Sequence, residues 1–338
     1  MKCLDILKAF CIPLLFLWLT TSCKQERKIY YQFTFEKNLE IGMESDESGN
    51  YLFSNVRDVA VDKSRNIYAL DAGNQRIQKY DMSGKYLMTI GRGQGRGPGQ
   101  FLAPNQLELI DSGDLYVSDP LSNRVTIFSE NGDYRHSFAL KERPAQMNVT
   151  KDGIIFIEAF AMFSNAGLIS QFNTDGRLIR TFGEKPERSV VMTGNSGRLA
   201  LNDEGDLYYS YHYPYKICKF NKDGKLLKTF SREVSSLFEP PLPPTRRDGK
   251  IIGGISQSGS IGLVVLPDGQ LLNVIFTTDK REFVDLFDKD GRHLVTVEKP
   301  FEGRILSADK YWQIYVYTTM PFPKVERYRV SLKQTRNP

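Results

Sequence analysis

The sequence predicts an all-β fold, a six-bladed β-propeller of four-stranded blades that is closed by the N-terminal strand. Three observations predict it: a segment that occurs twice at a fixed offset, a hairpin signal that recurs along the chain, and unmatched strands at both ends. Aromatic residues make up 12% of the chain, with 21 Phe and 17 Tyr. Such residues favour strands, where flat rings pack on a pleated surface.

The repeated segment lies between residues 55 and 138. Asp71 corresponds to Asp119, Arg76 to Arg124 and Gly84 to Gly132, each at an offset of 48 residues. Strands are expected at 67–70, 77–80 and 85–90, after a first strand near residue 59. A fixed period of about 40–50 residues with several short strands per copy is typical of propeller blades.

A hairpin signal, a polar residue followed by glycine, marks the outer edge of each unit. Its glycines are Gly84, Gly132, Gly176, Gly224 and Gly291, separated by 48, 44, 48 and 67 residues. The longest interval contains four prolines between residues 239 and 244, which cannot sit in a central strand because they lack an N–H donor. We therefore interpret 232–257 as an insertion between blades.

The two ends of the chain are incomplete on their own. Strands are expected at 305–308, 313–317 and 325–330 with no fourth, while 29–35 alternates as a lone strand. Pairing of 29–35 with the last blade would remove exposed edges and complete a sixth blade. The propeller is thus predicted to span 29–333, followed by a short tail at 334–338.

Residues 1–22 resemble a bacterial signal peptide. Lys2 and Lys8 flank the start of an apolar run at 9–19, which is too short to span a bilayer, and small residues precede Cys23. The resemblance to a lipobox implies cleavage before Cys23, lipidation of its thiol and a tether at 23–28. An ordinary signal peptide with an incidental cysteine is the alternative. We expect a lipid-anchored protein of the cell envelope, with the outer membrane favoured, that faces the periplasm or the surface.

Composition excludes some classes of partner. The 45 basic and 40 acidic residues nearly balance, which does not favour nucleic-acid binding. Cys218 would be the one cysteine left after lipidation of Cys23, and its apolar neighbours suggest a core residue.

The first two copies carry a recognisable motif. Its members are Asp71, Asn74 and Arg76 in the first copy and Asp119, Asn123 and Arg124 in the second. With the segment 97–101, it resembles the NHL-type six-bladed propeller, in particular the lipidated extracytoplasmic forms of Bacteroidetes. Blade four has Tyr211 and Lys216 at the Asp and Arg places, and blade three has Glu158. We interpret the repeated Asp and Arg residues as braces within a blade, since they recur at equivalent places.

Candidate binding residues lie where the copies differ. Arg92 and Arg96, in the glycine-rich linker between blades one and two, are candidates for binding a carboxylate or sulfate; a solvated loop is the alternative. A second candidate is an aromatic patch for a sugar ring, a peptide or another protein. Its residues are Phe160, Phe163, Tyr211, His212 and Tyr213. The alternative, that these rings fold over and close the core, is equally compatible with the sequence.

No catalytic constellation is visible. Of the three histidines, His136 and His293 are predicted on outer strands, and only His212 near the channel. No cofactor is predicted, and the metal content is unknown, although a carboxylate-held structural cation in the channel is left open. The sequence favours a non-enzymatic module that binds a glycan, a peptide or an envelope protein through one loop face. The alternative is a metal-assisted lyase or hydrolase.

Overall fold

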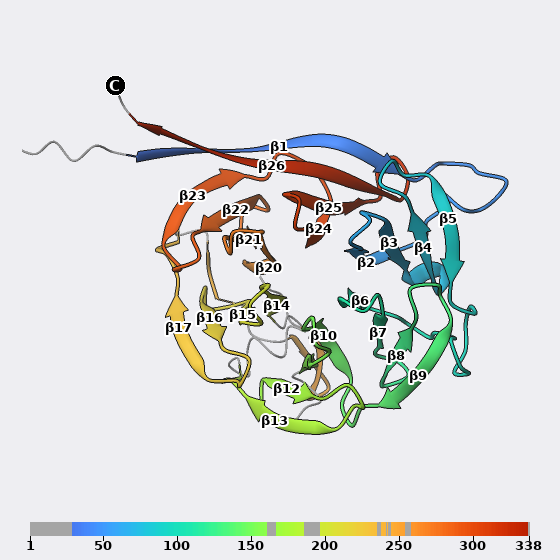
Figure 1. Cartoon of the computed structure of the whole chain (residues 1–338). Coiled ribbons are helices and arrows are strands. Elements are labelled where there is room, and N and C mark those ends of the chain that lie inside the picture. Colours follow the sequence, from blue (N-terminus) through green and yellow to red (C-terminus); the bar gives the residue numbers. More distant parts are fainter. Residues whose placement is uncertain are drawn as a thin grey trace, which may run out of the picture.

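The computed structural model describes residues 29–160, 167–185, 197–234, 238–240, 242, 245–253 and 258–336. Six four-stranded antiparallel sheets are arranged in a ring around a central channel, as the sequence predicted (Figure 1). The predicted signal peptide, Cys23, the tether and Phe163 lie outside the described residues. In the described part, no helix is long and apolar enough to cross a membrane.

Each blade places its first strand next to the channel and its fourth strand on the rim (Figure 1). Blade one comprises β2 (Val56–Val61), β3 (Ile67–Asp71), β4 (Arg76–Tyr80) and β5 (Tyr86–Ile90), with a short 3-10 helix η1 (Ala72–Asn74). Blade two comprises β6 (Gln106–Leu109), β7 (Leu115–Asp119), β8 (Arg124–Phe128) and β9 (Tyr134–Ala139). Blade three comprises β10 (Pro144–Val149), β11 (Ile155–Ala159), β12 (Ile169–Phe172) and β13 (Leu178–Phe182).

The second half of the ring repeats this pattern. Blade four comprises β14 (Arg198–Leu201), β15 (Leu207–Ser210), β16 (Ile217–Phe220) and β17 (Leu226–Phe230). Blade five comprises β20 (Gly259–Val265), β21 (Leu271–Phe276), β22 (Glu282–Phe287) and β23 (His293–Glu298). Blade six comprises β24 (Arg304–Ala308), β25 (Gln313–Thr318), β26 (Lys324–Arg336) and, from the N-terminus, β1 (Ile29–Ile41).

Strand β1 closes the ring. It pairs antiparallel with β26 from Ile29 opposite Arg336 to Ile41 opposite Val325, so it is longer than the predicted strand 29–35. Phe33 and Ile41 are buried in the core. Because β1 pairs with β26 as the fourth and outermost strand of blade six, it completes that blade and leaves no exposed edge on β26.

The up-and-down order of strands divides the loops between two faces. On one face, here called the turn face, lie the loops from first to second strand and from third to fourth strand. On the other, the crossover face, lie the loops from second to third strand and the connections between blades. The five hairpin glycines adopt positive φ, from 76° to 87°, on the turn face, which confirms their role as turn residues.

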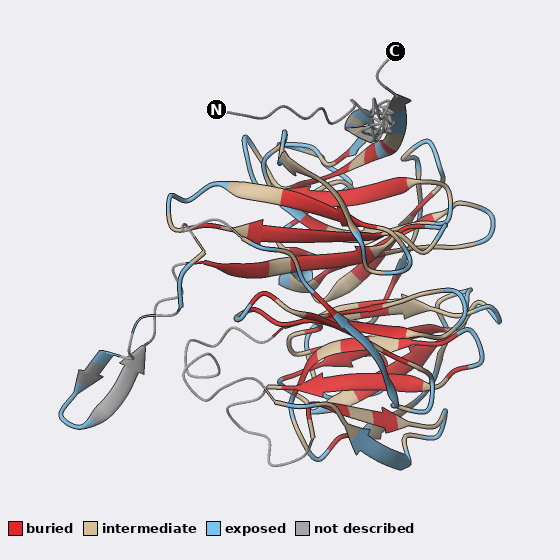
Figure 2. Cartoon of the chain, turned by 90° about the vertical axis from the view of Figure 1, so that its left-hand side faces the viewer, coloured by how far each residue is buried: buried red, intermediate tan, exposed pale blue. Residues whose placement is uncertain are grey.

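The core lies between neighbouring blades, where large side chains of facing sheets pack together. Tyr80, Phe128 and Tyr208 are among the largest fully buried residues. Cys218 is also buried, as predicted. Between blades four and five, the structure shows a two-stranded hairpin that the sequence did not predict, β18 (Thr245–Arg247) and β19 (Lys250–Gly253). It projects from the disc on the crossover side (Figure 2).

Candidate functional site

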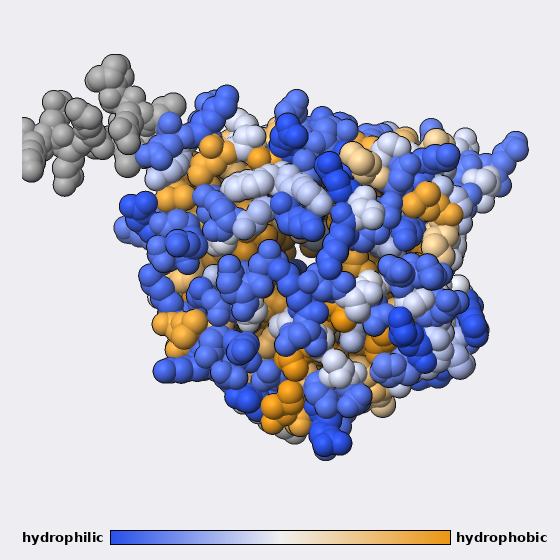
Figure 3. Space-filling model, viewed as in Figure 1, coloured by the Kyte–Doolittle hydropathy of each residue, from blue (hydrophilic) through white to orange (hydrophobic). Residues whose placement is uncertain are grey.

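A hollow on the turn face, here called the funnel, leads into the channel. Its volume is about 740 Å³, and it is lined by inner strands of all six blades and the loops that follow them. Figure 3 views this face, which is mostly hydrophilic around a narrow central opening. The loops form the wide rim because each inner strand ends there, while the strands themselves form the narrow part.

The funnel is acidic although the whole chain carries a net charge of +5. Ten carboxylates and four lysines line it. The carboxylates are Asp58, Asp62, Glu108, Asp111, Glu130, Asp152, Asp203, Glu204, Asp223 and Asp309, and the lysines are Lys63, Lys151, Lys222 and Lys310. Two lysines are paired within it, Lys63 with Asp111 at 3.4 Å and Lys151 with Asp203 at 3.0 Å. The excess negative charge favours a cationic ligand.

Two carboxylates, Asp58 and Glu108, lie deepest in the funnel. Asp58 accepts hydrogen bonds from the backbone N–H groups of Val59, at 2.9 Å, and Leu107, at 3.0 Å, so it joins blades one and two. Burial raises the pKa of Asp58 to about 7. Burial and then the charge of Asp58 raise the pKa of Glu108 to about 8, although water still reaches Glu108 through the channel.

Amide side chains connect these carboxylates to blade three. Asn148 Nδ2 donates to Glu108 Oε1 at 2.5 Å, and Gln106 Nε2 donates to Gln146 Oε1 at 3.3 Å. The Oδ1 atom of Asn148 is buried and has no hydrogen-bond partner among the described residues. The narrow part of the funnel therefore presents carboxylate and amide groups, which can bind a polar ligand.

The aromatic residues predicted as a sticky patch behave differently from one another. Tyr211 and His212 are 2% and 3% exposed, so for these two the patch prediction is wrong and the core-closing alternative holds. The Tyr211 hydroxyl donates to the Glu184 carbonyl at 2.6 Å, and the His212 ring lies 2.9 Å from the Ser260 carbonyl. Burial lowers the pKa of His212 to about 4, which keeps the ring neutral.

Tyr213 and Phe160 remain partly exposed on the crossover face. The Tyr213 ring stacks on Phe238 with 5.9 Å between centroids. Neither residue lines the funnel. The predicted patch is thus divided between core and surface, and the funnel lies on the opposite face.

Arg92 and Arg96 lie exposed in the crossover loop between blades one and two. The Arg96 side chain donates to the Leu121 carbonyl at 3.3 Å, and both residues are absent from the funnel lining. Their predicted role in anion binding therefore stays a prediction.

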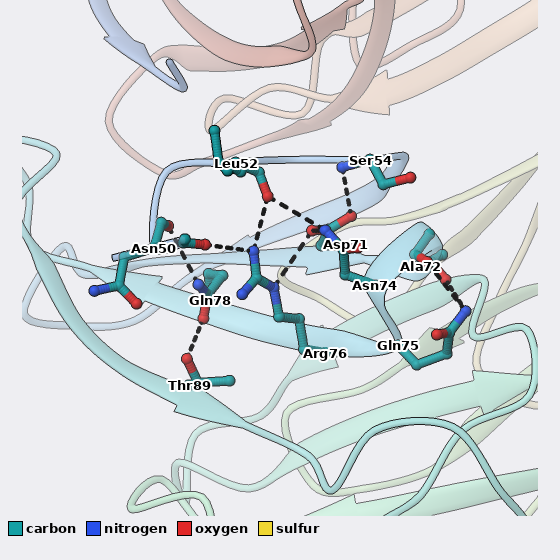
Figure 4. A network of polar contacts seen from close by, with 12 residues as sticks. Asn50, Leu52, Ser54, Asp71, Ala72, Asn74, Gln75, Arg76, Gln78 and Thr89 are labelled. Atoms are coloured by element: carbon teal, nitrogen blue, oxygen red, sulfur yellow. Dashed lines mark hydrogen bonds and ion pairs between the residues drawn. The ribbon is translucent and has the colours of Figure 1, made fainter. Parts of the chain in front are cut away.

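The motif residues of blade one form a brace, as predicted (Figure 4). Asp71 is fully buried and its Oδ1 accepts the N–H groups of Ser54 and Asn55, both at 3.1 Å. Its Oδ2 accepts Asn74 Nδ2 at 2.7 Å and lies 3.5 Å from Arg76 Nε. The brace thus fastens the crossover loop to the hairpin between the second and third strands.

Blade two uses the same residues with one difference. Asp119 accepts the N–H groups of Leu102, at 2.7 Å, and Ala103, at 3.1 Å. Arg124 donates to the Arg96 carbonyl at 2.7 Å and to the Gln100 carbonyl, and it makes no ion pair with Asp119 in the part of the chain that the structure describes. Asn123 adopts positive φ, as does Gln75 at the equivalent place in blade one. A direct Asp–Arg contact is therefore a property of blade one.

Among the described residues, no group of three or more His, Cys, Asp or Glu side chains has the geometry to hold a metal ion. His136 and His293 lie on the outer strands β9 and β23, as predicted.

Sequence reasoning did not single out Asp58 and Glu108. A signal was present, because each is a carboxylate within a short inner strand that also contains apolar residues. In a central strand of a closed ring, such a charge faces either the core or the channel.

Comparison with known proteins agrees with this fold. The chain belongs to the DUF5128 family, described as a 6-bladed beta-propeller, whose model matches residues 41–316. Over 165 residues, this chain is 26% identical in sequence to the protein Brain tumor of Drosophila melanogaster. That match covers 47% of this chain and 14% of the relative, so the chain spans about one seventh of that protein's length.

Solved structures share the architecture at low sequence identity. A Bacteroides fragilis protein that is predicted to be exported superposes with a TM-score of 0.63, at 11% identity over 90% of this chain and 95% of that chain. A DUF4221 member from Bacteroides vulgatus superposes with a TM-score of 0.64, at 10% identity over 90% of this chain and 99% of that chain. Virginiamycin B lyase from Staphylococcus aureus gives 0.54, at 13% identity over 88% of each chain. These similarities establish the fold alone.

Proposed function

We propose that this member of the six-bladed propeller family is a non-enzymatic binding module, held in the cell envelope by a lipid on Cys23. Its rigid ring supports a ligand site in the funnel of the turn face. The N-terminal sequence supports the anchor, since an apolar run and small residues precede Cys23. The resemblance in fold to a Bacteroides fragilis protein that is predicted to be exported is consistent with a location outside the cytoplasm.

The acidic funnel carries the proposal. Its volume of about 740 Å³ is within the range of small-molecule sites, roughly 300–1,000 Å³. With Asp58 and Glu108 set aside because their pKa values are raised to about 7 and 8, the other eight carboxylates still outnumber the four lysines, although the whole chain has a net charge of +5. We therefore expect a polar ligand with ammonium or guanidinium groups, such as a basic peptide. A glycan or an envelope protein bound through the crossover face is less well supported, because Tyr211 and His212 are buried there.

Isothermal titration of the purified propeller with trilysine tests the ligand site. The informative variant is Asp152→Asn with Glu204→Gln, which removes two carboxylates from the funnel rim. A matched control is Asp175→Asn with Asp290→Asn, since these two exposed carboxylates lie on the same face outside the funnel.

We expect the rim variant to weaken trilysine binding about fivefold or more, corresponding to roughly 1 kcal/mol, and the control variant to bind like the wild type. Binding should also weaken with added salt, because rim charges are screened. Equal loss in both variants, or no binding of trilysine by the wild type, would contradict the proposal. A metal that copurifies in stoichiometric amount and supports turnover would instead favour the lyase or hydrolase alternative.

Membrane fractionation tests the anchor. Replacement of Cys23 by Ala should release the protein from membranes, because the lipid is attached to its thiol. Cys218→Ala is the matched control, since Cys218 is a buried core residue and cannot carry the lipid. Continued membrane association of the Cys23 variant would count against lipidation.

A further inference from the structure

Three arginines lie on inner strands at the crossover end of the channel, opposite to the funnel. Arg57 is the second residue of β2, and Arg198 and Arg304 are the first residues of β14 and β24. The inner strands all start at the crossover face, so these residues lie at the same level of the ring. None of the three lines the funnel.

Their hydrogen bonds leave donors unused. Arg198 donates through Nε to the Ile261 carbonyl at 3.0 Å and through Nη1 to the Gly197 carbonyl at 2.9 Å. Arg304 donates through Nη2 to the Val56 carbonyl at 3.1 Å. None of the three arginines makes an ion pair with a carboxylate in the described ranges, and no side-chain hydrogen bond of Arg57 is found there. These backbone contacts hold the guanidinium groups of Arg198 and Arg304 in place.

The charges of Arg57 and Arg198 both act on Arg304. Burial and then the charges of Arg57 and Arg198 lower the pKa of Arg304, and burial lowers the pKa of Arg198. Guanidinium groups nevertheless stay protonated in proteins. The charge of Arg198 also contributes to the lowered pKa of His212.

The nearby carboxylates offset this positive charge poorly. Burial raises the pKa of Glu158, on β11, to about 8, so at neutral pH it is mostly neutral. Its Oε1 accepts the Tyr209 hydroxyl at 2.8 Å, and its Oε2 is buried without a hydrogen-bond partner among the described residues. Asp58 binds the backbone N–H groups of Val59 and Leu107, and its pKa is raised to about 7.

We propose that Arg57, Arg198 and Arg304 form a binding site for an oxyanion, a carboxylate or phosphate group, at the crossover end of the channel. Guanidinium groups bind such anions with paired, charge-assisted hydrogen bonds. Three of them from three different blades surround a single anion and relieve their mutual repulsion when it binds. The site is separate from the funnel, and it stands whether or not the funnel binds a cation.

Isothermal titration with sodium phosphate and with sodium succinate, each against sodium chloride at matched ionic strength, tests this site and distinguishes the two sources of oxyanion. The variants are Arg57→Gln and Arg304→Gln, measured separately. Arg57 makes no described side-chain hydrogen bond, so its replacement should leave the fold intact, and circular dichroism with thermal unfolding checks this for both. The matched control is Lys141→Gln, which removes one exposed cation on the same face, in the connection between β9 and β10.

We expect the wild type to bind one of the two anions above the chloride background, and each single variant to bind it about tenfold more weakly. The control variant should bind like the wild type. If neither anion binds, or if a folded Arg57→Gln variant binds as the wild type does, the site does not exist as proposed. An equal loss of binding in the control variant would show that exposed cations on this face bind the anion, and this outcome would overturn the proposal as well.

Discussion

The two ends of the central channel differ in charge although both are built from the same six inner strands. The turn-face end presents ten carboxylates and four lysines, whereas the crossover end holds Arg57, Arg198 and Arg304. Repeated residues such as Asp71 and Asp119 also lie on the crossover face. Their carboxylates accept hydrogen bonds from backbone N–H groups, however, and do not line the channel. The comparison teaches that the repeat builds the ring, and that the residues which vary between blades give each end its chemistry.

The two ends of the channel differ in charge only while the ring is closed. Removal of β1, which closes the ring, should therefore reduce stability more than any other change considered below. A chain that begins at Glu36 lacks Phe33, which is buried, and Phe35, which packs on Phe301 with 5.2 Å between ring centroids. We expect a loss of at least about 4 kcal/mol in the free energy of unfolding, measured by urea denaturation. A chain that begins at Ile29 retains all of β1 and should unfold like the mature protein. Equal stability of the two chains would refute closure by β1.

Loss of the brace in blade one should have the next largest effect, on stability and not on binding. Asp71→Ala leaves the N–H groups of Ser54 and Asn55 without their acceptor and Arg76 without its carboxylate. We expect a loss of about 3 kcal/mol in urea denaturation. The control Glu47→Ala removes an exposed carboxylate from the loop that precedes blade one and should cost less than about 1 kcal/mol. A change in phosphate binding with unchanged stability would instead assign Asp71 to the ligand site.

The sequence predicted the ring and the brace because both depend on local patterns. Strand alternation, turn glycines and the Asp–Arg spacing are all read within one repeat of about 48 residues. The charges in the channel could not be predicted in this way. Arg57, Arg198 and Arg304 lie far apart in sequence and meet only when the ring closes. The burial of Tyr211 likewise depends on how blade four packs against blade three, and the burial of His212 on how blade four packs against blade five, which no local pattern determines.

The carboxylates of the channel also predict how stability varies with pH. Asp58, Glu108 and Glu158 have pKa values raised to about 7, 8 and 8, whereas in the unfolded chain such groups titrate near 4. From about pH 4 to about pH 8, the folded state therefore holds protons that the unfolded state has lost, and stability falls as pH rises until these groups ionise in the folded state as well. His212 has the opposite effect, because its lowered pKa destabilises the fold only as pH falls below about 6.5.

We expect thermal unfolding between pH 6.5 and 8.5 to show this decrease, at constant ionic strength. The shift of three pKa units for Asp58 corresponds to at most about 4 kcal/mol over the whole range from pH 4 to 8, of which about 1 kcal/mol falls above pH 6.5, and water in the channel reduces both figures. Asp58→Asn should make the decrease shallower, and Asp175→Asn, an exposed carboxylate outside the channel, should leave it unchanged. A slope that is the same in all three proteins would mean that Asp58 is ionised in the folded protein throughout this range.

The smallest effect on stability is expected for the two loop arginines, and it decides whether they or Arg124 hold the crossover loop between blades one and two. Arg92 and Arg96 are exposed, and the contact of the Arg96 backbone carbonyl with Arg124, at 2.7 Å, survives replacement of the Arg96 side chain. We expect Arg92→Gln with Arg96→Gln to change the free energy of unfolding by less than about 0.5 kcal/mol. By contrast, Arg124→Gln removes the donor to the Arg96 and Gln100 carbonyls and should cost about 1–2 kcal/mol. If urea denaturation gives this order, Arg124 from blade two holds the loop, and the side chains of Arg92 and Arg96 do not contribute to the stability of the ring. The reverse order would mean that Arg92 and Arg96 hold the loop themselves, and the residues that vary between blades would then have a structural role at this end.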